Sequence, residues 1–354
     1  MKTRKNSRFC KFETLESRQL MAGDVTATIL SGNRLVITEA AGQIGTDNGV
    51  SISLVNGKIR VTGDYPAEGG SGISKINGKN FQDFMMPTNA FFNLEVNLGK
   101  GNDSVSLPAS ATLPTFQTMK LNIGNPPPVI SASAFVAGGN SINNVPDTDE
   151  VWIEAARVKG AVSIYTGEAN DRVFMGDFQV GSAGYGNLSI DTGAGSDQVD
   201  LQTTSGQPQS LVKGILDLET YDHITELSSN SVNINGIKTN GNLQVRMGDG
   251  VDTLLINDTV SLAKMDLKTG GGIDTATLRK ITTSQGLFAN MGAGNDHLTL
   301  DTLTGKATLD GGLGYDELTL RNVSMANVTQ YSFDISTLTS KTKPVGTMDS
   351  LDVI

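Results

Sequence analysis

Residues 265–278 read MDLKTGGGIDTATL, residues 287–300 read LFANMGAGNDHLTL and residues 307–320 read ATLDGGLGYDELTL. The three segments align without a gap, and each contains a glycine-rich turn that ends in an aspartate. Apolar residues lie nine and seven positions before this aspartate, and two and four positions after it. Apolar residues two apart with polar residues between them are typical of a β-strand with one buried face. Each segment therefore predicts a strand, a turn and a second strand.

The same pattern occurs seven times along the chain. The turns end at Asp103, Asp171, Asp197, Asp252, Asp274, Asp296 and Asp316. A glycine lies four residues before the aspartate in every copy, and the successive spacings are 68, 26, 55, 22, 22 and 20 residues. The spacing of 68 divides if Asp149 to Ile153 is a degenerate copy, and the spacing of 55 divides near Tyr221 to Ile224. Residues 46–52 are a candidate for the first copy.

A unit of about 22 residues cannot bury its apolar face alone, so repeats of this length are stable only when they stack on one another. The sequence therefore predicts an all-β protein, a parallel β-solenoid with coils of about 22 residues and terminal caps. We expect it to be right-handed. Adjacent coils would lie at the strand spacing of ~4.8 Å, with like residues above like.

The repeats define the expected domain organisation. We expect a basic leader at 1–23, an N-terminal β region at 24–95, the solenoid at 96–320 with a loop insertion at 124–150, and a C-terminal cap at 321–354. The insertion contains a run of three prolines, which cannot continue a hydrogen-bonded ladder. In the N-terminal region, Asn56-Gly57 predicts a turn between two strands, and the region fits either early coils or a separate cap.

Composition excludes several classes of protein. The 354 residues include 27 Lys and Arg against 37 Asp and Glu, a formal net charge of −10. This balance argues against nucleic acid as a partner, because phosphate binding needs clustered cations. One cysteine, Cys10, excludes intramolecular disulfides and cysteine-based zinc sites. No stretch reaches the ~18 apolar residues of a membrane-spanning helix.

The first residues differ from the rest of the chain. Residues 1–20 contain six cations and two anions, a net charge of +4, and residues 12–22 read FETLESRQLMA. This segment resembles the LEPR-XLL leader of secreted or surface proteins of planctomycete bacteria, although Ser17 replaces the usual proline and Met21 the second leucine. The resemblance implies export, so we expect an extracellular or cell-surface location.

The glycine-rich turns resemble degenerate RTX, or haemolysin-type, calcium-binding repeats, G-G-x-G-x-D-x-U-x. Residues 311–319, GGLGYDELT, match every position, whereas most other turns lack the first glycine. The resemblance implies Ca²⁺ held between stacked turns. The expected metal ligands are Asp252, Asp274, Asp296 and Asp316, with less complete turns at Asp103, Asp171 and Asp197.

Electrostatics offers separate support for a cation. Carboxylates stacked ~4.8 Å apart would repel one another by roughly 1 kcal/mol in water and ~3.5 kcal/mol at an effective dielectric constant of 20. A hard cation bound by carboxylate and carbonyl oxygens would reverse that sign. The alternative needs no metal: an aspartate that ends a glycine-rich turn often accepts hydrogen bonds from its own backbone. Both interpretations stay open at this point.

No catalytic or cofactor-binding residues emerge from the sequence. The polygalacturonases that share the β-helix fold need adjacent aspartates and a Gly-His-Gly segment, and neither occurs here. Trp152 is either an exposed stacking residue for sugar or a misplaced core residue. We therefore expect a non-catalytic structural or adhesive scaffold with polysaccharide or other surface or matrix proteins as partners. The alternatives are a calcium-binding RTX-like module and a polysaccharide-cleaving enzyme.

Overall fold

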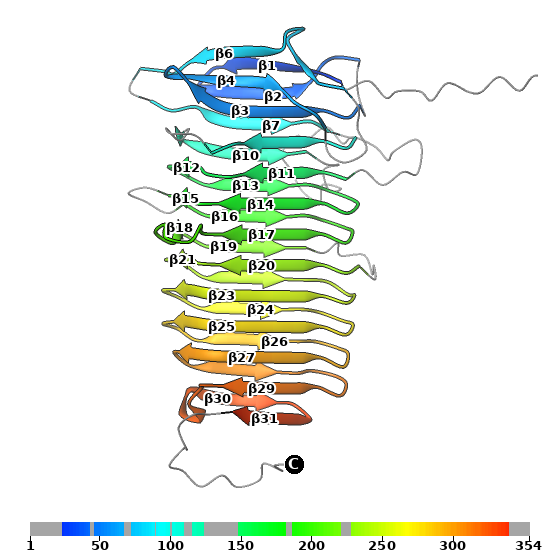
Figure 1. Ribbon diagram of the computed structural model, residues 1–354, viewed down its shortest axis with the longest axis vertical. Helices are drawn as coiled ribbons and strands as arrows, with labels where there is room; N and C mark the ends of the chain where they lie inside the picture. Colours follow the sequence, from blue (N-terminus) through cyan, green and yellow to red (C-terminus); the bar gives the residue numbers. More distant parts are fainter. Residues whose placement is uncertain are drawn as a thin grey trace, which may run out of the picture.

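The computed structural model describes residues 23–42, 46–66, 72–88, 90–99, 101–109, 115–123, 148–181, 186–220 and 228–339. These residues form an elongated stack of strands (Figure 1). Their single helical turn is a 3-10 turn, η1 (Met325–Asn327), and none of their helices could span a membrane. The leader up to residue 22, the insertion at 124–147 and the residues from 340 onward lie outside the described part of the chain.

The described strands belong to two sheets. Sheet A contains β1 (Asp24–Leu30), β2 (Arg34–Glu39), β5 (Lys75–Ile76), β7 (Asn93–Asn97), β10 (Thr118–Asn122), β13 (Val162–Tyr165), β16 (Leu188–Asp191), β19 (Leu216–Glu219), β22 (Leu243–Arg246), β24 (Met265–Lys268), β26 (Leu287–Asn290), β28 (Ala307–Asp310) and β30 (Val328–Ser332). From β7 onward its neighbours pair in parallel and skip the strands of the other sheet.

Sheet B contains the strands that follow the glycine turns. It contains β3 (Gly49–Val55), β4 (Lys58–Gly63), β6 (Phe81–Met85), β8 (Ser104–Leu107), β9 (Thr115–Phe116), β11 (Glu150–Ile153), β12 (Arg157–Val158), β14 (Arg172–Gly176), β15 (Gln179–Val180), β17 (Gln198–Gln202), β18 (Ser210–Val212), β20 (Ser231–Asn235), β21 (Ile237–Thr239), β23 (Thr253–Ser261), β25 (Thr275–Thr283), β27 (His297–Thr304), β29 (Glu317–Arg321) and β31 (Ile335–Thr339).

The predicted apolar columns fill the interior. One column of sheet A shows the pattern, because its residues pair in register from coil to coil and all have buried side chains: Val162, Leu188, Leu216 and Leu243. In sheet B the residues two and four after the turn aspartate are stacked in the same way. The prediction of an all-β parallel solenoid is confirmed. Each fully buried Leu, Ile or Val contributes roughly 1.5–3 kcal/mol, so the columns supply most of the stabilisation.

A second turn position, present in six of the described coils, was not expected from the sequence. Six residues after the turn aspartate the backbone adopts a positive φ, between 43° and 70°. The residues at this position are Asp177, Gly236, Asp258, Lys280, Thr302 and Asn322. The chain bends there, and residues beyond the bend, such as Val180 and Ile281, also bury their side chains. In β23, β25 and β27 the strand continues through the bend.

The N-terminal region combines two kinds of strand. β2 and β3 pair in parallel with β7 and β8, in register with the solenoid columns. β1 pairs antiparallel with β2, and β4 pairs antiparallel with both β3 and β6. Asn56-Gly57 forms the turn between β3 and β4. These strands lie at one end of the stack (Figure 1). Residues 24–95 therefore contain both a first coil and added hairpin strands.

Two repeat positions differ from the sequence expectation. The copy between Asp197 and Asp252 is at Asn230, because β20 pairs in register with both β17 and β23. Tyr221 to Ile224, where we expected it, lies outside the described residues. At the other end β30 and β31 continue both sheets in parallel, so 321–354 begins with another coil. Residues 148–153 form the expected degenerate copy through β11.

Candidate functional site

The turn aspartates form one column along the interior edge of the stack. In each coil the side-chain oxygen of the column residue accepts a hydrogen bond from the backbone N–H of the column residue in the preceding coil, at 2.7–3.0 Å. The column runs through Asn48, Asp103, Asp149, Asp171, Asp197, Asn230, Asp252, Asp274, Asp296, Asp316 and Asp334. We call this set of residues the Asp column.

The geometry of the Asp column matches neither sequence interpretation in full. The seven predicted aspartates do stack in one column, with Asp149 and Asn230 in the two intervening coils. Their hydrogen bonds, however, join one coil to the next instead of closing each turn on itself. Asp103 and Asp274 are 0% exposed and Asp252 is 1% exposed, so the carboxylates are inside the solenoid. Each carboxylate links two coils.

Glycine makes this close stacking possible. Gly272, two residues before Asp274, has a φ of 128°, and a Cβ there would overlap the carbonyl oxygen of Gly250 in the preceding coil. Gly294 has the same relation to the carbonyl oxygen of Gly272. A side chain at either position would therefore push the turns apart and lengthen the hydrogen bonds of the Asp column.

Burial changes the acidity of the column. Removal from water raises the pKa of Asp103 well above its ordinary range and raises the pKa of Asp197 and of Asp252 to about 7. The same cause raises the pKa of Asp296 to about 6, although the backbone N–H of Asp274 opposes the shift. Burial disfavours the charged carboxylate, so the protonated form gains stability.

The second carboxylate oxygen has different surroundings along the column. In Asp103, Asp252 and Asp296 this oxygen is buried and accepts no hydrogen bond from the described residues. In Asp197 it accepts one from the hydroxyl of Thr192, at 2.6 Å. A buried oxygen without a donor is stabilised when it carries a proton. Asn230 shows that an uncharged amide can hold the same position.

The structure places the expected calcium ligands in one column, one in each coil, and their carboxylates do not converge on a common point. Among the described residues, no group of three or more His, Cys, Asp or Glu side chains could hold a metal ion. The carboxylates of Asp252, Asp274, Asp296 and Asp316 follow one another along the stack, each bound to a backbone N–H. Ca²⁺ takes six to eight converging oxygens. Calcium binding stays a prediction of the sequence resemblance.

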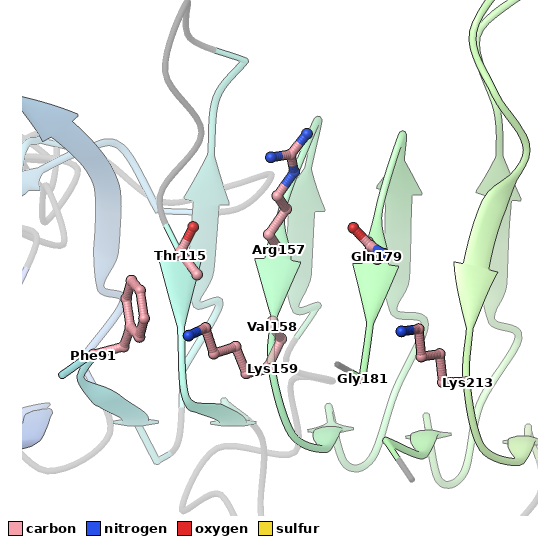
Figure 2. A pocket seen from close by; sticks show the side chains of 8 residues that line it. All are labelled: Phe91, Thr115, Arg157, Val158, Lys159, Gln179, Gly181 and Lys213. Carbon is pink, nitrogen blue, oxygen red and sulfur yellow. The ribbon is translucent and has the colours of Figure 1, made fainter. Parts of the chain in front are cut away.

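A groove on the outside of the stack was not expected from the sequence. It has a volume of about 550 Å³ and lies along β9, β12, β15 and β18 (Figure 2). Its lining residues are Phe91, Thr115, Arg157, Val158, Lys159, Gln179, Gly181 and Lys213. We call it the basic groove, because the described residues that line it include three cationic side chains and no carboxylate.

Strand register explains how the groove forms. Val158, Val180 and Val212 pair with one another in parallel, so the next residues, Lys159, Gly181 and Lys213, occupy one column. Gly181 has no side chain, which leaves a gap between the two lysines. In Figure 2 Lys159 extends toward Phe91 and Lys213 extends toward the coil of Gly181. The Lys159 ammonium lies 4.0 Å from the centre of the Phe91 ring.

The sequence carried little signal for this groove. Its column is defined only when Asp149 and Asp197 are in register, and the lysines are 54 residues apart in a chain with interrupted repeats. Isolated surface cations are also the common case in any protein. Only the alignment of β12, β15 and β18 shows that these cations share one surface.

The outer face of sheet B carries an aromatic pair near the groove. The rings of Trp152 on β11 and Phe174 on β14 stack with centroids 4.2 Å apart and an angle of 16° between their planes. Trp152 is 39% exposed, so it is a surface residue and not a misplaced core residue. Stacking on Phe174 covers one face of its ring.

Comparison with known proteins does not identify this chain. No family model, no curated protein and no solved structure matches it significantly.

Proposed function

We propose that this protein is an exported, non-catalytic β-solenoid that acts as a structural or adhesive scaffold at the cell surface. The observation that carries the proposal is the unbroken Asp column. Its ten hydrogen bonds link eleven coils from Asn48 to Asp334. At the normal strand spacing these ten steps make a rod of ~48 Å.

A rod of this kind suits mechanical and adhesive roles. Buried apolar side chains stack on apolar side chains of the next coil, as Ile256 does on Leu278, so the coils cannot slide without breaking several contacts at once. The outer faces repeat mostly polar residues, for example the exposed Ser231, Thr253 and Thr275 on sheet B. Repeated weak contacts along one rigid surface add up to strong attachment by avidity. The leader resemblance supports export.

Cell-surface labelling tests the location. Intact cells that express the full chain are treated with an external protease and with a membrane-impermeant label, and the protein is then detected by antibody. We expect it to be labelled and cleaved before the cells lyse. A chain that is protected until lysis would overturn the proposed location.

Loss of the protein tests the role. We expect cells without it to lose attachment to one another or to the matrix, and the native chain to restore it. A chain with Gly272→Ala, whose turns cannot stack, should fail to restore attachment, whereas Gly206→Ala, in open space, should succeed. Normal attachment without the protein would contradict the scaffold. Release of sugar fragments from polysaccharides by the purified chain would contradict the non-catalytic assignment.

A further inference from the structure

We propose that the basic groove binds a strand of acidic polysaccharide that lies along the stacking direction across β9, β12, β15 and β18. This inference rests on the proposed function, because it names the ligand of the adhesive surface. It is carried by three properties of the groove: its position across coils, its charge, and the mixture of side chains that line it.

Position comes first. Lys159 and Lys213 occupy the same column two coils apart, so their backbones are separated by about two strand spacings, ~9.6 Å. Gly181 between them keeps the floor of the groove low. A linear chain that lies along the stacking direction can therefore contact both ammonium groups in turn. A small anion could contact only one.

Charge comes second. The protein as a whole is acidic, with a net charge of −10, yet the groove lining is cationic. Among the described carboxylates, none forms an ion pair with Arg157 or Lys159. By contrast, Arg246 on sheet A is held by Asp217 at 2.7 Å and by Glu219. Arg157 and Lys159 are therefore exposed cations that no described carboxylate neutralises, which favours an anionic ligand.

The lining chemistry favours a sugar polymer over nucleic acid. Double-stranded DNA carries a charge every ~1.7 Å, far denser than the cations of the groove, whose backbones are ~9.6 Å apart. A polymer of acidic sugars has at most one carboxylate on each ring and hydroxyl groups between them. Thr115 and Gln179 can exchange hydrogen bonds with those hydroxyls, and the half-buried Phe91 offers an apolar edge.

Binding of polygalacturonate tests the inference. The full chain is titrated by calorimetry with polygalacturonate, with neutral dextran and with duplex DNA of similar length. We expect binding of polygalacturonate that weakens as salt is added, and no binding of dextran. The double variant Lys159→Ala/Lys213→Ala should bind at least tenfold more weakly. Arg157→Ala should weaken binding by a smaller factor.

A charge-matched control separates the groove from net charge. Lys79→Ala/Lys268→Ala removes two exposed lysines elsewhere on the stack and should leave the affinity unchanged. Equal loss in both double variants, binding of dextran, or tighter binding of DNA than of polygalacturonate would each overturn the proposal. Thermal melts confirm that the variants fold. If polygalacturonate does not bind but the chain still restores cell attachment, the groove proposal fails while the scaffold stands.

Discussion

The two halves of the stack are built on the same coil but differ in regularity. From β22 to β29 the column residues are 20 or 22 apart, and β23, β25 and β27 run unbroken through the bend. From β10 to β21 the spacings are 22, 26 and 33 residues, and the strand is divided at each bend, as in β11 and β12. Both halves share the Asp column and the apolar interior.

This difference suggests that the regular half serves stability and the irregular half serves recognition. The basic groove and the Trp152–Phe174 pair both lie in the irregular half. In the regular half the column of Trp152 and Phe174 continues through Leu255, Thr277, Thr299 and Thr319. A solenoid can vary its outer residues and its loops freely as long as the interior columns continue, because each coil contacts only its neighbours. We therefore expect changes in the regular half to affect stability and changes in the irregular half to affect binding.

The largest effect should come from the tight turn of the regular half. Gly272→Ala places a Cβ against the carbonyl oxygen of Gly250 and strains a φ of 128°, so we expect a loss of more than ~4 kcal/mol in the free energy of unfolding. Gly206→Ala, where no atom lies within 4 Å, should lose only about 1 kcal/mol. Denaturant melts measure both. Ala169 occupies the position of Gly272 in the irregular half and has a φ of 97°. Equal losses for Gly272→Ala and Gly206→Ala would contradict the steric explanation.

The next effect concerns the Asp column. Asp274→Ala removes the acceptor of the Asp252 N–H and leaves that buried group unpaired, so we expect a loss of about 2–3 kcal/mol in the free energy of unfolding. Asp274→Asn keeps the acceptor, as Asn230 does in the irregular half, and should change stability by less than about 1 kcal/mol. Denaturant melts at neutral pH compare the variants. An equal loss in both would show that the charge, and not the hydrogen bond, matters.

The raised pKa values of the Asp column should make stability depend on pH in the same direction in both halves. The folded pKa values of Asp197 and Asp252, about 7, lie above the ordinary value of about 3.9, so their stabilising contribution is complete at low pH and disappears as the pH rises through about 7. We expect each to contribute on the order of 1–2 kcal/mol more at pH 5 than at pH 7.5. Melting temperatures across this range test it, and Asp252→Asn should flatten the profile. A melting temperature that rises from pH 5 to pH 7.5 would contradict protonation of the column.

A smaller gain is expected at the bend of the regular half. Thr302 is β-branched and has a φ of 64°, a conformation that strains such residues. Asn322 occupies the same position one coil later. Thr302→Asn should therefore raise the free energy of unfolding by about 1 kcal/mol. Thr304→Asn, two residues farther along the strand, is the control and should not stabilise. No gain at Thr302 would show that the strand beyond the bend absorbs the strain.

The smallest effect should follow removal of calcium. Because the carboxylates of the Asp column already accept backbone hydrogen bonds, we expect thermal melts with millimolar calcium and with EDTA to coincide. A midpoint several degrees higher in calcium, abolished by Asp274→Ala together with Asp316→Ala, would instead favour the RTX-like interpretation.

The repeat and its apolar interior can be predicted from local sequence patterns alone. Alternating apolar residues at fixed distances from each turn aspartate can be satisfied only by strands that stack in register, because a single coil cannot bury them. The positions of the glycines, the degenerate copy at Asp149 and the Asn56-Gly57 turn were all readable for the same reason. They depend on local periodicity or on a residue's own backbone preferences.

Features that depend on contact between coils could be found only in the tertiary structure. Whether the Asp274 carboxylate accepts a hydrogen bond from its own turn or from the preceding coil depends on the distance between turns, which no local pattern encodes. Asn230 was missed because insertions separate it from its neighbours and it is not an aspartate. The bend at Lys280 and Thr302 was missed because neither residue type signals a positive φ. The basic groove exists only because strands from residues 115 to 213 come into register, and register is set by the packed core.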